Sequence, residues 1–319
     1  MPNTEQREKL KKAMEGLKKG PETKAPHIMD MKELMYEVDS KVRRLSDVFS
    51  FLLTYQILFR GTGLEFAQLK EYVPGEDDAT RIDWKASLRT GKVYIKQYEE
   101  ERELDILVLL DICSSMGFGT QERIKREFAG IMAGAIISAG IEIGDNVGFC
   151  MYSDKIKKFL EPSNDETQYY RSLELIVDES LYGGKCDLDK ALRFVLNNVR
   201  ENTILFLISD FIGVGTEWED SLKMVSGKLN DVMGLMVRDL RDEFLPKGSG
   251  NFRFMDPYSN RTVIVDLDKA KEQYEKIAKE QSDHVMHVFR RSNAGFVKVF
   301  THEPFVKALI KELTIRRVI

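Results

Sequence analysis

The chain has 319 residues, of which 43% are hydrophobic and 31% are charged, and its formal net charge is −4. This composition is typical of a soluble globular protein with one large domain, or a domain with an appendage, and the lack of a basic excess argues against nucleic-acid binding. The longest apolar stretch, Ala129 to Ile141, is too short to span a bilayer, so no membrane insertion is expected.

Residues 1–60 form the first predicted unit, an N-terminal helical segment. Thr4 to Lys19 has only a narrow apolar stripe, and Gly20 to Pro26 interrupts the pattern as a linker. Apolar residues then recur at helical spacing between Met31 and Phe59, which predicts one or two amphipathic helices. The first twenty residues are rich in basic side chains without an apolar core, and we do not expect a secretory signal there.

Residues 61–103 form the second predicted unit, a small appended β element. Leu64 to Val73 and Val93 to Tyr98 have strand patterns and are joined through a Pro74-Gly75 turn.

Four residues of this connection are candidates for partner binding: Arg81, Asp83, Trp84 and Arg89. An aromatic side chain beside arginine is favoured at interface hot spots. The sequence favours a packing role instead, in which Trp84 seals one end of the sheet and Asp83 pairs with Arg81 or Arg89, because such residues usually pack when they lie in a turn.

The third predicted unit, residues 104–319, alternates apolar runs with helical patterns. We expect an α/β fold with a mostly parallel sheet and helices on both faces, and a β insertion near residues 240–267. The predicted strands are 104–110, 146–152, 156–160, 203–209, 232–238, 252–255, 262–265 and 296–300, and the predicted helices are 121–141, 165–177, 187–199, 218–229, 267–291 and 304–313.

The most informative residues lie where two predicted strands end. Asp111-Ile112-Cys113-Ser114-Ser115 follows the first strand of this unit, and Ser209-Asp210 closes the strand that begins at Thr203. A third segment, Gly183-Gly184-Lys185-Cys186-Asp187, precedes a helix. Ligand sites of open α/β sheets lie at the carboxyl ends of the strands, so we expect the three segments to meet there. Taken alone, the first segment could simply be a turn in which a serine caps the next helix.

Enzymatic motifs are missing at this edge. The chain has no phosphate-binding loop, and Glu122 stands where a dinucleotide fingerprint after Gly117 would need glycine. No catalytic triad with a serine or cysteine nucleophile can be assembled, because no histidine has a recognisable spacing to Asp111. His284 and His287 are three residues apart on a predicted helix, but they lack a metalloprotease context.

A longer set of motifs carries a family resemblance. The strings G-T-G-L-E-F, E-Y-V-P-G-E-D, R-I-D-W, R-T-G and E-E-E-R-E-L follow one another between Gly61 and Leu104. In order and spacing they resemble the domain of unknown function 58 family. This resemblance, which extends over about Leu34 to Leu313, implies a von Willebrand factor A-like, doubly wound fold and partnership with MoxR-type AAA+ ATPases.

The segments at the sheet edge also resemble the metal-ion-dependent adhesion site of von Willebrand factor A domains. In that comparison Asp111, Cys113 and Ser115 stand for the first loop, Cys186 for the loop threonine and Asp210 for the distal aspartate. Two expected hydroxyls are thiols, and sulfur is a poor ligand for Mg²⁺. We therefore expect a degenerate site with at most weak Mg²⁺ binding, strengthened by Cys113→Ser together with Cys186→Thr.

Two functions follow from these patterns. The first is a non-catalytic protein-protein interaction module, an adaptor or substrate-recognition partner of a MoxR-type AAA+ ATPase. The alternative is a thiol-based redox sensor or small enzyme that uses Cys113 and Cys186, with Cys113 the more reactive because it precedes a helix. Three cysteines far apart in sequence indicate a reducing compartment, the cytoplasm, and Cys150 is expected to be a buried strand residue.

Overall fold

The structure is a computed structural model. It describes residues 36, 66–73, 82–90, 92–98, 104–246, 250–259, 261–305 and 308–309. The predicted N-terminal helices, apart from Tyr36 in a helical conformation, lie outside the described residues, as does most of the predicted closing helix.

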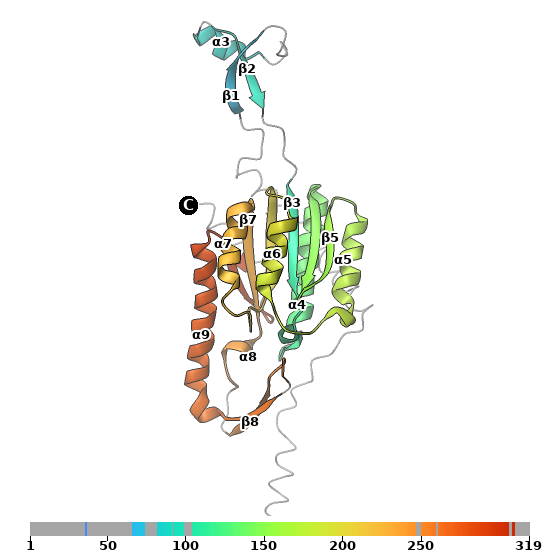
Figure 1. Cartoon of the computed structure of the whole chain (residues 1–319), viewed down its shortest axis with the longest axis vertical. Coiled ribbons are helices and arrows are strands. Elements are labelled where there is room, and N and C mark those ends of the chain that lie inside the picture. Colours follow the sequence, from blue (N-terminus) through green and yellow to red (C-terminus); the bar gives the residue numbers. More distant parts are fainter. Residues whose placement is uncertain are drawn as a thin grey trace, which may run out of the picture.

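The appended β element is a two-stranded antiparallel sheet, separate in hydrogen bonding from the main sheet (Figure 1). Its strands are β1 (Phe66–Glu71) and β2 (Tyr94–Tyr98), and the helix α3 (Trp84–Thr90) lies between them in the chain. The sequence pattern did not predict α3. Ser87 links the helix to β2, because its hydroxyl accepts a hydrogen bond from the Tyr94 amide and also donates to the Asp83 carbonyl just before the helix.

The main sheet has six strands in the order β10-β7-β6-β3-β4-β5. All neighbours are parallel except β4 and β5, which pair antiparallel at one edge. The predicted mostly parallel sheet is therefore confirmed. The strands are β3 (Asp105–Asp111), β4 (Asn146–Tyr152), β5 (Ile156–Ser163), β6 (Thr203–Ser209), β7 (Asp231–Arg238) and β10 (Gly295–Phe300).

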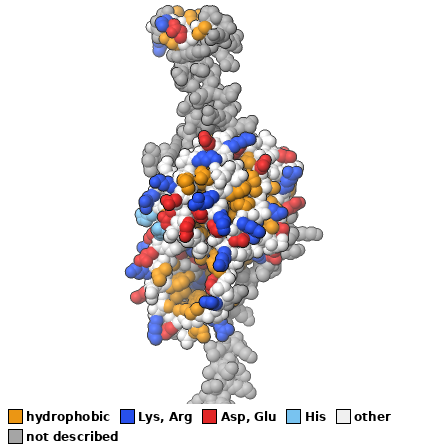
Figure 2. All heavy atoms as spheres, viewed as in Figure 1, with side chains coloured by type: hydrophobic (Ala, Val, Ile, Leu, Met, Phe, Trp, Pro, Cys, Tyr) orange, Lys and Arg blue, Asp and Glu red, His pale blue; other side chains and the backbone are white. Residues whose placement is uncertain are grey.

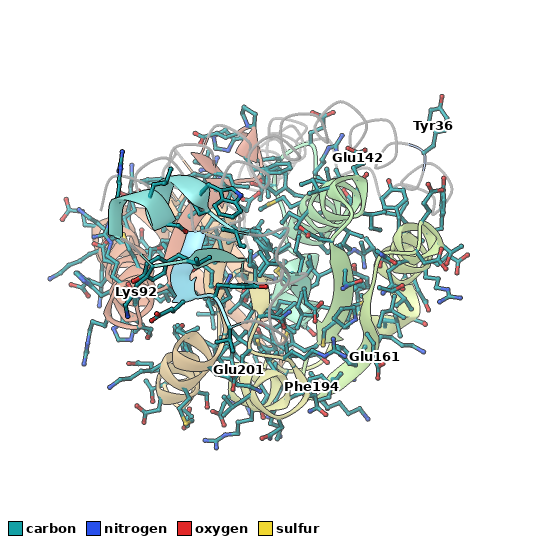
Figure 3. The ribbon with its side chains drawn as sticks, turned by 90° about the horizontal axis from the view of Figure 1, so that it is seen from above. Tyr36, Lys92, Glu142, Glu161, Phe194 and Glu201 are labelled. Atoms are coloured by element: carbon teal, nitrogen blue, oxygen red, sulfur yellow. The ribbon has the colours of Figure 1, made fainter. Side chains whose placement is uncertain are left out.

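Helices cover both faces of this sheet, as the view from above shows (Figure 3). Ile106 and Val108 face one core, with α4 and α5, whereas Leu107 and Leu109 face the other, with α6, α7 and α9. Because both faces are buried, β3 is a continuous apolar run rather than an alternating one. These helices are α4 (Lys125–Ile143), α5 (Thr167–Val177), α6 (Leu188–Asn198), α7 (Trp218–Lys228) and α9 (Leu267–Arg291).

The predicted β insertion is an antiparallel hairpin at the carboxyl end of the sheet. Its strands are β8 (Asn251–Met255) and β9 (Thr262–Asp266), and the short helix α8 (Leu240–Glu243) precedes them. The Tyr258 hydroxyl donates to the Ile212 carbonyl at 2.9 Å, in the loop that follows β6. This bond holds the hairpin beside the carboxyl edge.

The helix α4 begins later than the pattern predicted, at Lys125 rather than Gln121. In the loop before the helix, the amide and the hydroxyl of Thr120 both donate to the Asp239 carboxylate at 2.7 Å. The first residue of the helix is Lys125, whose side chain reaches the site described below.

Candidate functional site

The first loop of the site follows β3. Asp111 ends the strand with a buried side chain, and its Oδ1 accepts a hydrogen bond from the Cys113 amide at 2.8 Å. A 3-10 helix, η3 (Ser114–Gly117), comes next. The alternative in which a serine caps the next helix is wrong, because the residue at the N-terminal cap is Cys113 for η3 and Ile124 for α4.

The second loop joins the short 3-10 helix η4 (Glu179–Leu181) to α6. Gly183 and Gly184 have φ angles of 114° and 90°, which side chains rarely adopt. This backbone lies against the first loop: the Ser114 amide donates to the Gly184 carbonyl, and the Gly184 amide donates to Ser114 Oγ, both at 3.0 Å. The glycines thereby bring Cys186 to the end of β3.

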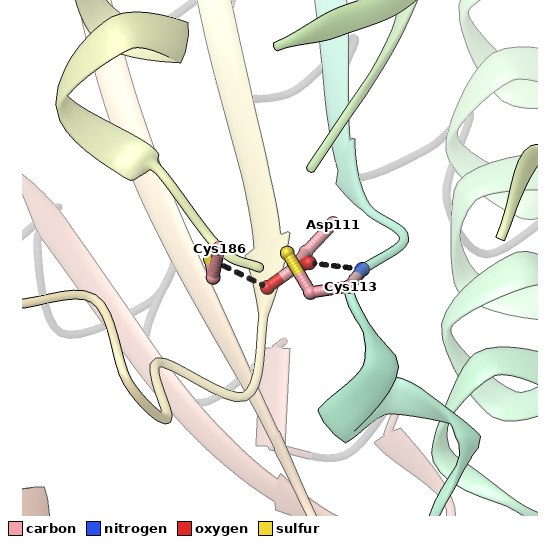
Figure 4. Close-up of side chains that lie close together, drawn as sticks. All are labelled: Asp111, Cys113 and Cys186. Atoms are coloured by element: carbon pink, nitrogen blue, oxygen red, sulfur yellow. Dashed lines mark hydrogen bonds between the residues drawn. The ribbon is translucent and has the colours of Figure 1, made fainter. Parts of the chain in front are cut away.

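Together the two loops form a cluster of one carboxylate and two thiols (Figure 4). One ligand atom from each of Asp111, Cys113 and Cys186 lies within 4.8 Å of the other two. The Cys186 thiol lies 3.6 Å from Asp111 Oδ2, which also accepts a 2.6 Å hydrogen bond from the Ser209 hydroxyl. The sequence pattern predicted that these loops meet at one edge of the sheet, but it did not indicate Ser209 as a partner of Asp111.

The third loop follows β6 and carries Asp210. Phe211, the next residue, has a φ of 53°, unusual for a bulky side chain. Two contacts hold this conformation: the Phe211 amide donates to Ser209 Oγ at 2.9 Å, and its ring packs edge-on against Phe289 of α9 at 5.6 Å. Asp210 Oδ1 accepts hydrogen bonds from the Ile212 amide at 2.9 Å and the Ser115 hydroxyl at 3.2 Å.

A buried lysine neutralises Asp210. The ammonium of Lys125 lies 2.7 Å from Asp210 Oδ2 and 3.0 Å from Asp242 Oδ2, and the lysine side chain is only 1% exposed. The pattern of acidic residues at strand ends did not indicate Lys125 or Asp242 as members of the site. One signal was available: a lysine in the first turn of a helix opposes the helix dipole, which favours carboxylates there.

The donor set does not fit Mg²⁺, the metal that the resemblance implies. Two of the five matched positions carry sulfur, whereas Mg²⁺ prefers an octahedron of oxygen ligands. The oxygens of Asp210 are also engaged, since one side faces the Lys125 ammonium and the other accepts the Ser115 and Ile212 bonds. A fixed internal cation therefore stands beside the carboxylate that a metal would need.

The thiols differ from the prediction for their reactivity. Cys113 is 1% exposed, and its pKa is raised well above the usual range by the Cys186 thiol, by burial and by the Asp111 charge. The prediction that Cys113 is the more reactive thiol is therefore wrong, because Cys113 is buried and is followed by the short 3-10 helix η3, while α4 begins only at Lys125. A hydrogen bond with Cys113 lowers the pKa of Cys186, but burial and Asp111 outweigh it, so the pKa is raised.

Cys150 lies buried in β4, as predicted, and burial raises its pKa to about 12. The imidazole of His284 contacts Glu219 of α7 at 2.9 Å. Among the residues that the structure describes, the Asp111 cluster is the one group of three potential metal ligands, and it contains no histidine.

Residues 68–284 match the model of the family described as "Protein of unknown function DUF58", well over half of the chain. The chain belongs to the DUF58 family. Similar relatives of this DUF58 protein include uncharacterized proteins of Mycobacterium bovis and Mycobacterium tuberculosis, each 24% identical over 263 residues and 82% of both chains.

Solved structures similar to this DUF58 protein share little sequence with it. The conserved hypothetical protein BatB from Bacteroides thetaiotaomicron has a TM-score of 0.42 and 14% identity, over 67% of this chain and 98% of that one. An aerotolerance-related membrane protein from Bacteroides fragilis has a TM-score of 0.43 and 16% identity, over 66% and 99%. Within the described part of the DUF58 chain, no helix combines the length and apolarity needed to cross a bilayer.

The candidate partner-binding residues of the DUF58 signature lie on and before α3. The Trp84 side chain is 65% exposed, so the favoured packing role, in which it seals the sheet, is wrong. Leu88, one turn later on the same face, is 84% exposed, and Arg89 is also exposed. The Asp83 amide donates to the Tyr94 carbonyl, while Arg81 lies outside the described residues.

Proposed function

We propose that this DUF58 chain is a non-catalytic protein-binding module with a von Willebrand factor A-like, doubly wound fold and a degenerate metal-ion-dependent adhesion site. In this proposal it acts as an adaptor or substrate-recognition partner of a MoxR-type AAA+ ATPase. The strand order and the convergence of the three loops at one sheet edge support the fold assignment. The resemblance in the family signature supports the choice of partner.

The observation that carries the binding role is an exposed apolar surface at the carboxyl edge. We define the hairpin surface as the exposed side chains of β8 and β9 together with Ile277 of α9. Ile264 is 65% exposed and Ile277 is 56% exposed. Met255, which is also exposed, lies on the same face of the hairpin as Ile264, whereas the exposed Phe252 and Val263 lie on its opposite face. Figure 2 shows apolar side chains gathered at the end of the molecule where Figure 1 draws β8.

A groove of about 240 Å³ continues this surface toward the site. Ile212, Tyr274 and Ile277 line it, and Asp242 reaches it from the Lys125 ion pair. Exposed apolar patches rimmed by polar groups are typical of protein-interaction sites. The position of this one, beside the loops that end the parallel strands, matches the face through which A domains are expected to bind partners.

The chemistry of the three loops also favours binding over catalysis. Asp210 is neutralised by a buried lysine, and the Cys113 thiol is buried with a raised pKa. Neither group is poised as a general base or nucleophile at neutral pH.

The alternative, a thiol redox role, rests on the proximity of Cys113 and Cys186, whose sulfurs lie within 4.8 Å. Oxidation would join them in a disulfide. The buried thiols make this the second choice, because thiol exchange needs an accessible thiolate.

The test is co-purification of the full chain with the MoxR-type ATPase of the same organism, in the presence of ATP, followed by affinity measurement. We expect Ile264→Asp to weaken binding at least ten-fold, since a charge in an apolar interface core costs more than about 1.4 kcal/mol. Met224→Asp is the matched control, because Met224 is an exposed apolar residue on α7, outside the hairpin surface. Equal binding by both variants, or no binding by the natural chain, would contradict the proposal.

A second contact surface is α3, whose Trp84 and Leu88 project from one exposed face. Trp84→Ala is expected to weaken the same complex without lowering the free energy of unfolding of the main domain, because the indole is mostly in solvent. An unchanged affinity would remove α3 from the interface and leave the hairpin surface as the binding site.

A further inference from the structure

We propose that Asp111, Cys113 and Cys186 form a Zn²⁺ site at the carboxyl edge of the sheet. The mismatch with Mg²⁺ described above is specific to hard metals, and the same residues are a suitable donor set for a borderline-soft one. Zn²⁺ is bound by Cys sulfur and by carboxylate oxygen in tetrahedral sites. This inference is independent of the adaptor role.

The distances between the donors support the site. All three ligand atoms lie within 4.8 Å of one another. With Zn–S near 2.3 Å and Zn–O near 2.1 Å, the edges of a tetrahedral site are roughly 3.5 to 3.8 Å. The observed 3.6 Å between Cys186 Sγ and Asp111 Oδ2 already matches such an edge. Small side-chain rotations would therefore bring the donors to their places around an ion.

The charge distribution gives a second, independent reason. The buried Asp111 carboxylate accepts hydrogen bonds from the Cys113 amide, the Ser209 hydroxyl and the Cys186 thiol, all of them neutral donors. Across the described residues, no ion pair joins Asp111 to a basic side chain, whereas neighbouring Asp210 has Lys125. An unpaired buried carboxylate is costly, and a Zn²⁺ ion bound to it would give it a direct cationic partner, while the net charge of the cluster stays the same because two thiol protons leave as the ion enters.

The surroundings hold the donors in place. The Ser209 hydroxyl, at 2.6 Å from Asp111 Oδ2, orients the carboxylate, as the hydrogen-bond partners of metal ligands do. The two loops that carry the cysteines are joined by the paired hydrogen bonds between residues 114 and 184. Cys186 is partly exposed, and its side of the cluster gives an ion a path from solvent.

Binding has a defined proton balance. Two Zn–S bonds and one Zn–O bond form, and the two S–H protons are released to solvent, with water at the fourth position. The affinity must therefore rise with pH, as it does wherever thiols must lose protons to bind a metal.

The test is a titration of the reduced, chelator-treated full chain with Zn²⁺ against a chromophoric chelator. We expect one equivalent to bind with a Kd below about 1 μM, a fall of at least about 100-fold in affinity for Cys186→Ser, and a fall of at least about 10-fold for Asp111→Asn. Cys150→Ser is the matched control, since Cys150 is a buried cysteine in β4 outside the cluster, and its affinity is expected to be unchanged. Co²⁺ is expected to give a thiolate charge-transfer band that Cys186→Ser loses.

No bound Zn²⁺, an equal loss in Cys150→Ser, or displacement of Zn²⁺ by Mg²⁺ at similar concentration would overturn the site. Thermal unfolding gives an additional readout, because a ligand of the folded state raises the melting temperature. Zn²⁺ is expected to raise it in the natural chain and not in Cys186→Ser. Ile264→Asp is expected to keep full Zn²⁺ affinity, so failure of the metal site and failure of the adaptor role are distinguishable.

Discussion

Replacing Lys125 with methionine tests whether this lysine stabilises the carboxyl edge of the sheet. Lys125→Met keeps most of the length of the side chain and removes its charge. Asp210 and Asp242 would then face each other's charge in a buried site, with side chains 0% and 8% exposed. Breaking a buried pair from one side costs about 3 to 5 kcal/mol, because the remaining charge stays buried without compensation.

The matched control is Lys190→Met. The Lys190 ammonium lies 2.7 Å from Asp187, the same distance as in the Lys125 pair, but the lysine side chain is 66% exposed. An exposed ion pair contributes about 0 to 1 kcal/mol, since water screens it. Urea unfolding of both variants, followed by circular dichroism, therefore compares two ion pairs that have the same N–O distance but differ in burial.

A rescue separates lost charge from lost packing. Adding Asp210→Asn to Lys125→Met is expected to restore part of the lost free energy of unfolding, because one buried anion is removed with its partner. The reasoning is refuted if Lys125→Met costs no more than Lys190→Met, or if the double variant is less stable than the single one.

Three further predictions concern the titratable groups and the metal preference. Burial, and then Asp105, raise the pKa of Asp145 from 3.8 to about 6, which favours the protonated folded state; stability should therefore fall as pH rises from about 4 to 6. The full effect of this shift on the free energy of unfolding would be about 3 kcal/mol, and we expect about 1 kcal/mol because Asp145 is partly exposed. In urea unfolding, Asp145→Asn should therefore stabilise the fold by about 1 kcal/mol at pH 7 and have little effect near pH 4. Alkylation of the native, metal-free chain followed by peptide mapping should modify Cys186 first, because it is the one of the three cysteines with partial exposure; earlier labelling of Cys150 would contradict the burial order. The double variant Cys113→Ser with Cys186→Thr should still bind Mg²⁺ weakly in calorimetry, because the Lys125 ammonium remains paired with Asp210. Adding Lys125→Met should strengthen Mg²⁺ binding. Tight Mg²⁺ binding by the double variant would show that the ammonium does not prevent it.

Local patterns in the sequence determined the main sheet and the place of the site. The strands β3, β4, β6 and β7 are apolar runs, as expected for a sheet buried on both faces. The predicted helix at Leu267–Arg291 agrees with α9 residue for residue. Asp111 and Asp210 were found because each is the first acidic side chain at the end of such a run. Parallel strands end at one edge, so their convergence followed from the topology.

The tertiary structure alone decided the chemistry of the site. Lys125 looks like an ordinary surface lysine in the sequence, and it is an internal cation because the fold places the first turn of α4 beside the loop after β6, where its ammonium lies 2.7 Å from Asp210 Oδ2. The exposure of Trp84 and the burial of the Cys113 thiol were also decided by which segments lie against them. Burial and charge pairing depend on contacts between residues about 80 to 120 positions apart, and no local pattern encodes them.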